Sequence, residues 1–370
     1  MPAPDWMALR MDILDCLDSD TCLKIFMCLD DPADLVRVSC VSRSWRRFVV
    51  ENCLCKKLCW KLFPPSNQFD YVVETTKSPK AKSFSNCEVD CLEKEHRAYP
   101  FLSRGCSSFP IRGLICDAIS ASSTDNYPDE TVRNTLEQSP TVSRRASYWS
   151  SSGQSDPSVP EVLIYKLVSK ICVVSEISVQ PFQAYFQWGL PIYAAKAVRF
   201  RMGHLKSNSN SNSGPSECPE DYVWTYTSPI YPMSQENTLQ RFSLPEPVLC
   251  LGGHLQVELL GRVQRQDMDG LFYICVCYVE AVGRSLSPAF DMDVEETSEK
   301  LVLKALSYSY PPALEPTPAV ASRPPAPPAP PAPLLPNVRQ LDLIMNMFRG
   351  GGDLDFHQLI EEDDFVDEFE

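Results

Sequence analysis

Short apolar segments that recur between residues 114 and 283 constrain the fold of this chain more than any other feature. Each is four to twelve residues long and is separated from the next by Gly, Pro, Ser or Asn. In the segment 254–260, Leu and Val alternate with Gln256 and Glu258, which predicts a strand with one buried and one solvated face. The repeated pattern predicts an antiparallel β-sandwich over residues 113–284. The expected strands are 162–168, 173–179, 195–200, 222–226, 254–260 and 271–282.

Residues 10–63 predict a compact helical unit, because they contain no glycine and are rich in Leu, Val, Cys and Arg. Apolar residues recur at three- and four-residue steps from Ser19 to Leu29, which indicates a first helix. Asp31 followed by Pro32 is typical of a helix start, and a third helix is expected from about Ser42.

The other segments have less regular patterns. Residues 64–112 mix Pro, Lys and Ser, and we expect a loosely structured connector. Residues 285–336 are predicted to be a proline-rich linker, because 12 of the 26 residues from 311 to 336 are Pro. In 337–370 a short helix is expected before an acidic tail whose last eighteen residues hold nine carboxylates. The predicted class is therefore α+β multidomain, with a disordered proline-rich and acidic C-terminal region.

Composition excludes several classes of function. The formal charge of -14 argues against nucleic-acid binding through a basic surface. No stretch approaches the roughly 18 consecutive apolar residues of a membrane span, so no membrane partner is expected. The N-terminus lacks the pattern of a secretory signal, and the sixteen cysteines are then expected to be reduced thiols in an intracellular protein of the nucleus or the cytoplasm.

No reactive constellation is evident, so we expect no enzyme, no cofactor and no metal. The four histidines lie in different segments, and no Gly-x-Ser-x-Gly motif occurs. The spacings Cys53-x-Cys55-x3-Cys59 and Cys87-x3-Cys91-x4-His96 do not match paired zinc knuckles. Buried free thiols explain these cysteines better than zinc does.

The ordered motifs of the helical unit resemble an F-box of a plant-like substrate receptor. They include Asp31-Pro32-x-Asp34-Leu35 and Arg43-x-Trp45-Arg46. The resemblance implies a three-helix F-box that binds a Skp-type adaptor and, through it, a cullin of a ubiquitin ligase. The positions that would bind the adaptor are Leu17, Leu23, Ile25, Phe26, Leu29, Pro32, Leu35, Val38, Val41 and Trp45.

Two points limit this resemblance. Asp18 stands where the family has Pro after its first Leu, which would weaken the first contact with the adaptor. In addition, some of the apolar residues are needed for the core of the helical unit itself, so not every matching residue can be a contact.

The sandwich region resembles the discoidin-type, galactose-binding-like fold, which is jelly-roll-like. The motifs that carry the resemblance are Tyr148-Trp-Ser-Ser-x-Gly153, Glu161-x-Leu-x-Tyr-x-Leu167 and the long segment 273–282. Another kind of β-sandwich remains the alternative. The resemblance concerns the fold and identifies no ligand.

Candidate contacts for a target lie in or beside the expected loops of the sandwich. Large aromatic residues there could bind a target but most often fill a core, and two arginines before the last strand are expected to be exposed. These candidates are Tyr185, Trp188, Trp224, Arg262 and Arg265. The sequence does not indicate whether the target is glycosylated, phosphorylated or unmodified.

The residues together predict a non-catalytic substrate-recognition subunit of a Skp–cullin–F-box ubiquitin ligase. One alternative is a scaffold or transcription-linked protein that acts through its acidic-apolar tail. Another alternative is a lectin-like protein that binds glycans through the sandwich.

Overall fold

The computed structural model describes residues 13–75, 87–138, 141–142, 145–206, 219–295, 298 and 300–310. Two compact units are distinguished, Met1–Phe182 with Ile192–Thr317 and Gln183–Pro191 with Pro318–Glu370, and each is described by itself. The proline-rich segment and the acidic tail predicted after residue 310 lie outside the described residues.

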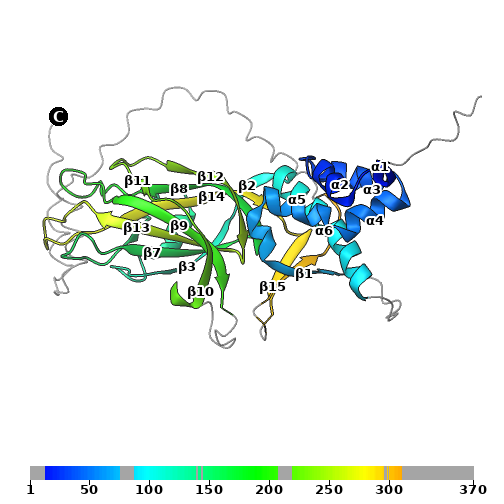
Figure 1. The fold of residues 1–370 in the computed structure, drawn as a ribbon. Coiled ribbons are helices and arrows are strands. Elements are labelled where there is room, and N and C mark those ends of the chain that lie inside the picture. The colour runs from blue at the N-terminus through cyan, green and yellow to red at the C-terminus, as the bar shows by residue number, and fades with distance from the viewer. Residues whose placement is uncertain are drawn as a thin grey trace, which may run out of the picture. The chain divides into compact units, whose positions relative to one another are not determined.

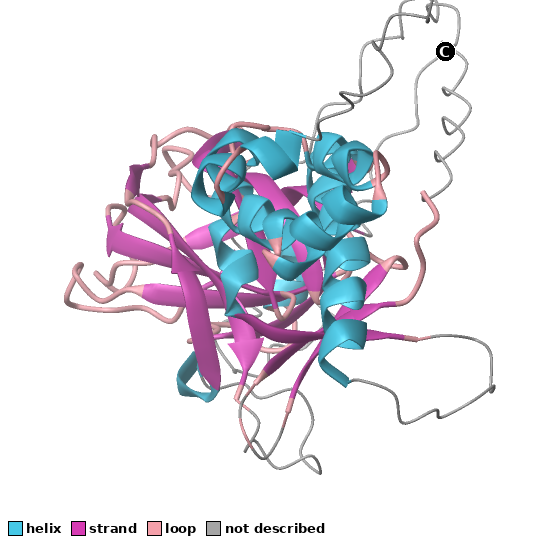
Figure 2. Ribbon diagram, turned by 45° about the vertical axis from the view of Figure 1, so that its right-hand side comes forward, coloured by secondary structure: helices cyan, strands magenta, loops and turns pink. Residues whose placement is uncertain are grey.

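The α-helices of the larger unit come early in the chain, with β1 between α5 and α6, and they are gathered together in space (Figure 1, Figure 2). Five helices precede residue 63 in the described part of the chain, so the helical unit predicted there is confirmed, but the expected count of three helices is not. The helices are α1 (Ile13–Cys16), α2 (Ser19–Phe26), α3 (Pro32–Ser39), α4 (Arg43–Glu51), α5 (Leu54–Leu62) and α6 (Cys87–Ser108).

Two antiparallel sheets form the β-sandwich that the sequence predicts. One sheet has the order β10-β9-β13-β7-β3, and the other has the order β12-β8-β14-β2. Leu163 and Val257 of the first sheet meet Val174 and Val279 of the second in one apolar core. The strands of the first sheet are β10 (Tyr222–Thr227), β9 (Ala195–Leu205), β13 (His254–Arg262), β7 (Glu161–Leu167) and β3 (Ile115–Ala121), with β11 (Tyr231–Pro232) beside β9. Those of the second are β12 (Gln240–Leu251), β8 (Ile171–Pro181), β14 (Cys275–Ser285) and β2 (Ile111–Gly113), with β6 (Trp149–Ser150) beside β14.

The segments expected to be a connector and a linker contribute regular structure, which corrects both expectations. Residues 64–112 contain β1 (Phe69–Glu74) and the 22-residue helix α6. Residues 285–336 begin with β15 (Phe290–Val294) and β16 (Leu301–Ala305). These three strands form one sheet in the order β1-β16-β15, in which β1 and β16 run parallel. A small hairpin of β4 (Thr141–Val142) and β5 (Arg145–Ala146) completes the described strands.

A second apolar core joins the helices to the sandwich. Ile171 and Val173 of β8, with Leu249 and Leu251 of β12, pack in a cluster that also contains side chains of α3, α4, α5 and α6. The alternate residues of the same strands point into the core of the sandwich instead. These ends of β8 and β12 are therefore buried on both faces, which explains their unbroken apolar sequences.

Candidate functional site

Short helices with side-chain caps hold the residues that are predicted to bind an adaptor. Asp18 accepts hydrogen bonds from the Thr21 backbone N–H (2.9 Å) and hydroxyl (2.7 Å) at the start of α2. These bonds lower the pKa of Asp18 below its ordinary value. Asp31 accepts a bond from the Ala33 N–H (2.8 Å), and Pro32 fits the first turn of α3. Asp18, which departs from the family pattern, is thus the cap of α2.

Three of the ten predicted adaptor residues are buried in the chain itself. Phe26, Pro32 and Leu35 have little exposed area, and Leu35 has none. The Phe26 ring lies 5.4 Å from the ring of Trp45 and 5.6 Å from that of Phe48. These three buried residues shape the helical unit, and an adaptor would not reach Leu35 directly.

Other apolar side chains of α2, α3 and the following turn remain open to solvent. Ile25 is 44% exposed and Val41 is 63% exposed. Val36, which was not among the predicted contacts, is 37% exposed although it follows the fully buried Leu35. The remaining predicted residues are half-buried: Leu17, Leu23, Leu29, Val38 and Trp45. We call the exposed and half-buried apolar residues named in this paragraph the helical docking surface: Leu17, Leu23, Ile25, Leu29, Val36, Val38, Val41 and Trp45. Exposed apolar surface of this kind is typical of a protein interaction site.

Ion pairs join the next two helices, α4 and α5, to α6. The Arg46 guanidinium binds the Glu93 carboxylate, and Lys56 Nζ lies 2.6 Å from Glu95 Oε1. The Lys56 and Glu95 side chains are mostly buried, at 15% and 14% exposed, so solvent screens this pair less than a surface pair. Such bonds hold the docking surface at a defined orientation to α6.

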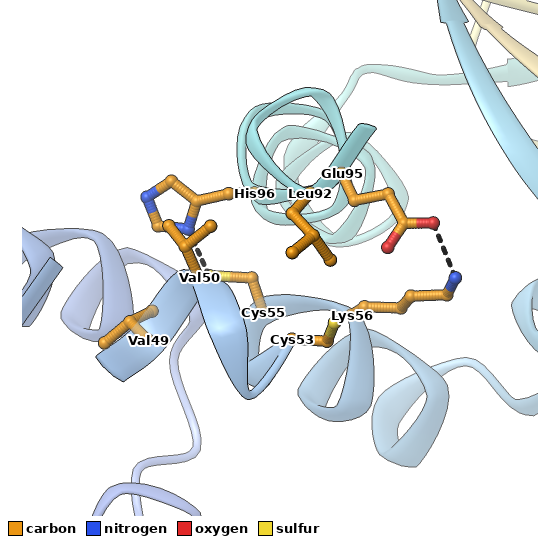
Figure 3. A pocket seen from close by; sticks show the side chains of 8 residues that line it. All are labelled: Val49, Val50, Cys53, Cys55, Lys56, Leu92, Glu95 and His96. Carbon is orange, nitrogen blue, oxygen red and sulfur yellow. Dashed lines mark hydrogen bonds and ion pairs between the residues drawn. The ribbon is translucent and has the colours of Figure 1, made fainter. Parts of the chain in front are cut away.

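A small cavity lies between α4, α5 and α6 (Figure 3). Cys55 Sγ is 3.4 Å from His96 Nδ1 at its edge. Burial raises the pKa of Cys55 to about 12, and burial together with the charge of Arg46 lowers the pKa of His96. Both groups are therefore neutral near pH 7, unlike an activated thiolate–imidazolium pair. The cavity is lined by Val49, Val50, Cys53, Cys55, Lys56, Leu92, Glu95 and His96.

No group of three or more His, Cys, Asp or Glu side chains that could hold a metal ion is found among the described residues. The pair Cys55 and His96 supplies two such side chains, and nothing in the described part of the chain completes the set.

Arg262, which was predicted to be an exposed target contact, is instead buried, with 1% of its surface exposed. Its guanidinium pairs with the carboxylate of Glu161 at the start of β7. Its other N–H groups donate to Ser151 Oγ (2.8 Å) and to backbone carbonyl oxygens of Val159 (3.1 Å), Ser152 (2.9 Å) and Phe272 (3.0 Å). The prediction was wrong because Arg262 is the last residue of β13, and its guanidinium is enclosed by two segments, the one that joins β6 to β7 and the one that joins β13 to β14.

Two other candidate target residues, Arg265 and Trp224, lie on different elements of the larger unit. Arg265 is exposed in the loop after β13, and its Nε donates to the carbonyl oxygen of Gly270. Trp224 is half-buried on β10, where its ring stacks on Tyr222 at 5.1 Å.

Two more candidates belong to the separate unit that contains Gln183–Pro191. Trp188 is 89% exposed and Tyr185 is 42% exposed. Hydrogen bonds within the loop, from the Ala184 N–H to the Pro191 oxygen (2.9 Å) and from the Leu190 N–H to the Gln187 oxygen (3.1 Å), define its shape. The loop thus presents an aromatic ring to solvent on an ordered backbone.

Comparison with known proteins agrees with this helical unit. Residues 15–61 match the family model described as F-box-like. The chain is 51% identical over 327 residues to F-box protein At4g00755 of Arabidopsis thaliana, which covers 85% of this chain and 87% of that protein. The chain belongs to the F-box protein family. F-box proteins are in general non-catalytic, and the F-box implies binding to a Skp-type adaptor.

Solved structures similar to the sandwich are also found. A family 32 carbohydrate-binding module, CBM32-3 from a glycoside hydrolase of Clostridium perfringens, is 13% identical, covers 45% of this chain and 90% of its own, and has a TM-score of 0.30. A fucolectin from striped bass, Morone saxatilis, is 14% identical, covers 49% of this chain and 48% of its own, and also has a TM-score of 0.30. These scores are too low to support any conclusion about a ligand.

One further structural finding concerns membranes. No helix in the described ranges is both long enough and apolar enough to cross a bilayer.

Proposed function

We propose that this chain is the substrate-recognition subunit of a Skp–cullin–F-box ubiquitin ligase in the nucleus or the cytoplasm. The helical docking surface binds the Skp-type adaptor, which connects the chain to a cullin, and the sandwich region binds a target. The observation that carries the proposal is the exposure of Ile25 and Val41 on an F-box whose other face is buried against α6.

The mechanism is an increase in effective concentration. A receptor that holds its target beside the ubiquitin-carrying enzyme makes ubiquitin transfer effectively intramolecular, without bond chemistry of its own. The second apolar core supports this role, because it links the helices and the sandwich through β8 and β12. A link of this kind holds the sandwich at a fixed position relative to the helices.

Titration calorimetry of the full chain with a purified Skp-type adaptor tests the adaptor half of the proposal. Ile25→Asp and Val41→Asp should each weaken binding by more than tenfold, since burial of one such side chain contributes about 1.5–3 kcal/mol. Val263→Asp is the matched control, because Val263 is also an exposed valine (40%) but lies after β13. Circular dichroism must first show that all three variants are folded.

Two results would contradict adaptor binding through this surface. One is a folded wild-type chain that does not bind the adaptor. The other is a pair of variants, Ile25→Asp and Val41→Asp, that bind as tightly as Val263→Asp.

We further propose that Trp188 and Tyr185 contact the target. An exposed Trp on an ordered loop offers a large apolar area at a low cost in conformational entropy. Arg265 and Trp224 are exposed or half-buried enough to contribute, whereas Arg262 is not.

Quantitative mass spectrometry of proteins that co-purify with the full chain tests this contact. Trp188→Ser should lose target proteins and keep the adaptor, whereas Ile25→Asp should lose the adaptor and keep the targets. Identical sets of proteins with the wild type and with Trp188→Ser would exclude Trp188 as a contact.

A further inference from the structure

Two buried cysteines face each other across neighbouring strands of the sandwich. Cys172 of β8 and Cys250 of β12 are direct partners in the antiparallel register. Both side chains are fully buried and belong to the sandwich core, so both point to the same side of the sheet. Directly paired residues of antiparallel strands have Cα atoms about 4.5–5.5 Å apart, which falls within the range that a disulfide spans.

The two side chains are neighbours in the reduced chain, and each affects the pKa of the other. The Cys172 thiol lowers the pKa of Cys250, while the Cys250 sulfur and burial raise the pKa of Cys172. The Cys250 thiol donates a hydrogen bond to the backbone carbonyl oxygen of His254, at 3.9 Å between the sulfur and the oxygen.

We propose that Cys172 and Cys250 are an oxidative modification site, at which a hydroperoxide converts the two thiols into an intramolecular disulfide. The register of β8 and β12 carries this proposal, since it pairs Cys172 directly with Cys250 and both side chains belong to the core on the same face of the sheet.

The chemistry is balanced with hydrogen peroxide as the oxidant. The Cys250 thiolate attacks one peroxide oxygen, the O–O bond breaks, and with one proton the products are a sulfenic acid and water. The Cys172 sulfur then attacks the Cys250 sulfur, the S–O bond breaks, and the departing hydroxide takes the Cys172 proton to form a second water. Two thiols are oxidised to one disulfide, and one hydrogen peroxide is reduced to two waters.

The pair lies beside a closed turn. Gly252 and Gly253, which follow β12, are buried, and their backbones are hydrogen-bonded to Lys170 (2.7 Å) and Leu167 (2.8 Å). Oxidation of the pair therefore requires a transient local opening of this turn to admit the peroxide.

Two other cysteines provide a matched control. Cys275 and Cys277 are also buried, at 5% and 2% exposed, but both lie on β14 and are not partners in any register. If burial alone decided which thiols form a disulfide, both pairs would behave alike. The pairing of the strands instead predicts a disulfide between Cys172 and Cys250 and none between Cys275 and Cys277.

Peptide mapping of the folded full chain after hydrogen peroxide treatment tests the proposal. The chain is then denatured, alkylated with N-ethylmaleimide and digested with trypsin without reduction. Cys172 is the single cysteine of the tryptic peptide 171–196, and Cys250 is the single cysteine of the peptide 242–262. We expect these two peptides to appear as one species, lighter than their sum by two hydrogens, that dithiothreitol separates.

Two variants distinguish oxidation of the proposed pair from oxidation of other buried cysteines. Cys275→Ser/Cys277→Ser should keep the linked peptides, and Cys250→Ser should lose them. If Cys250→Ser fails to fold, the wild type still decides, because the oxidised chain should melt at a higher temperature than the reduced one. The proposal is overturned if both peptides stay alkylated while an exposed thiol such as Cys116 is oxidised, or if Cys172 links to another cysteine.

Discussion

Replacement of Arg262 by Met should lower the stability of the chain more than replacement of any other ion-paired arginine described above. The change leaves the Glu161 carboxylate buried at 3% exposure without its cation, and it removes four other hydrogen bonds to surrounding loops. Removal of one partner from a buried ion pair costs about 3–5 kcal/mol. We therefore expect the free energy of unfolding to fall by about that amount.

Urea unfolding of the full chain, followed by far-UV circular dichroism, measures this loss. Arg199→Met is the control, because the Arg199 side chain is 27% exposed and its partner Glu258 keeps Arg201 nearby at 3.5 Å. Because Arg201 stays beside the Glu258 carboxylate, we expect Arg199→Met to lower the free energy of unfolding by less than Arg262→Met does. Equal losses in the two variants would refute the view that Arg262 organises the loops.

A double-mutant cycle sharpens the test. Glu161→Gln removes the buried negative charge, so the double variant with Arg262→Met should lose less stability than the sum of the two single changes. Strictly additive losses would mean that the two side chains do not act as a pair, and the geometric argument would fail.

Three further predictions concern stability. Leu35→Ala should lower the free energy of unfolding by about 2–5 kcal/mol, whereas Val41→Ala should change it by less than about 0.5 kcal/mol, as urea unfolding would show. Burial lowers the pKa of His254 in the folded chain to about 4. Between pH 6.5 and pH 4 the unfolded chain therefore binds a proton at His254 and the folded chain does not. Stability should thus fall as the pH drops from 6.5 toward 4, and His254→Gln should reduce the slope of urea midpoint against pH. Gly203→Ala should lower the thermal midpoint, because a Cβ there would lie 1.9 Å from a carbonyl oxygen of β10, while Gly113→Ala, with nothing within 4 Å, should not.

Local sequence patterns predicted the sandwich well, but proline residues hid one of its strands. The alternation in 254–260 corresponds to β13, whose residues pair with β7 and β9 on either side. β12 was missed because Pro245 and Pro247 interrupt it. They lie where the register shifts between Ser243 and Val248, so the strand continues on either side of them.

Long-range pairing explains the missed structure in 64–112 and 285–336. β1 pairs with β16, which lies more than two hundred residues later in the chain. Neither segment is long enough, or alternates clearly enough between apolar and polar residues, to predict a strand from its own sequence. α6 contains Pro100 and many charged residues, yet Ala98, Tyr99 and Leu102 are fully buried under the other helices. Contacts of this kind depend on the whole fold, which a local pattern does not contain.

The order of residues in the F-box predicted its helices but not which side chains face solvent. Leu35 and Val36 are adjacent apolar residues, and only the packing of α5 and α6 decides that Leu35 is buried. Arg262 shows the same limit for polar residues, because an arginine is usually exposed and only the whole fold brings Glu161 and four further acceptors to its guanidinium.

Because the ends of β8 and β12 are buried on both faces, the sandwich cannot be exchanged as an independent domain. A fragment cut at residues 113 and 284 would keep its own core but leave Ile171, Val173, Leu249 and Leu251 facing water. Such a fragment would aggregate through that strip, and a chimera with a foreign F-box would need matching residues on its helices. New target specificity in this architecture is therefore more accessible through changes in the loops than through replacement of the sandwich.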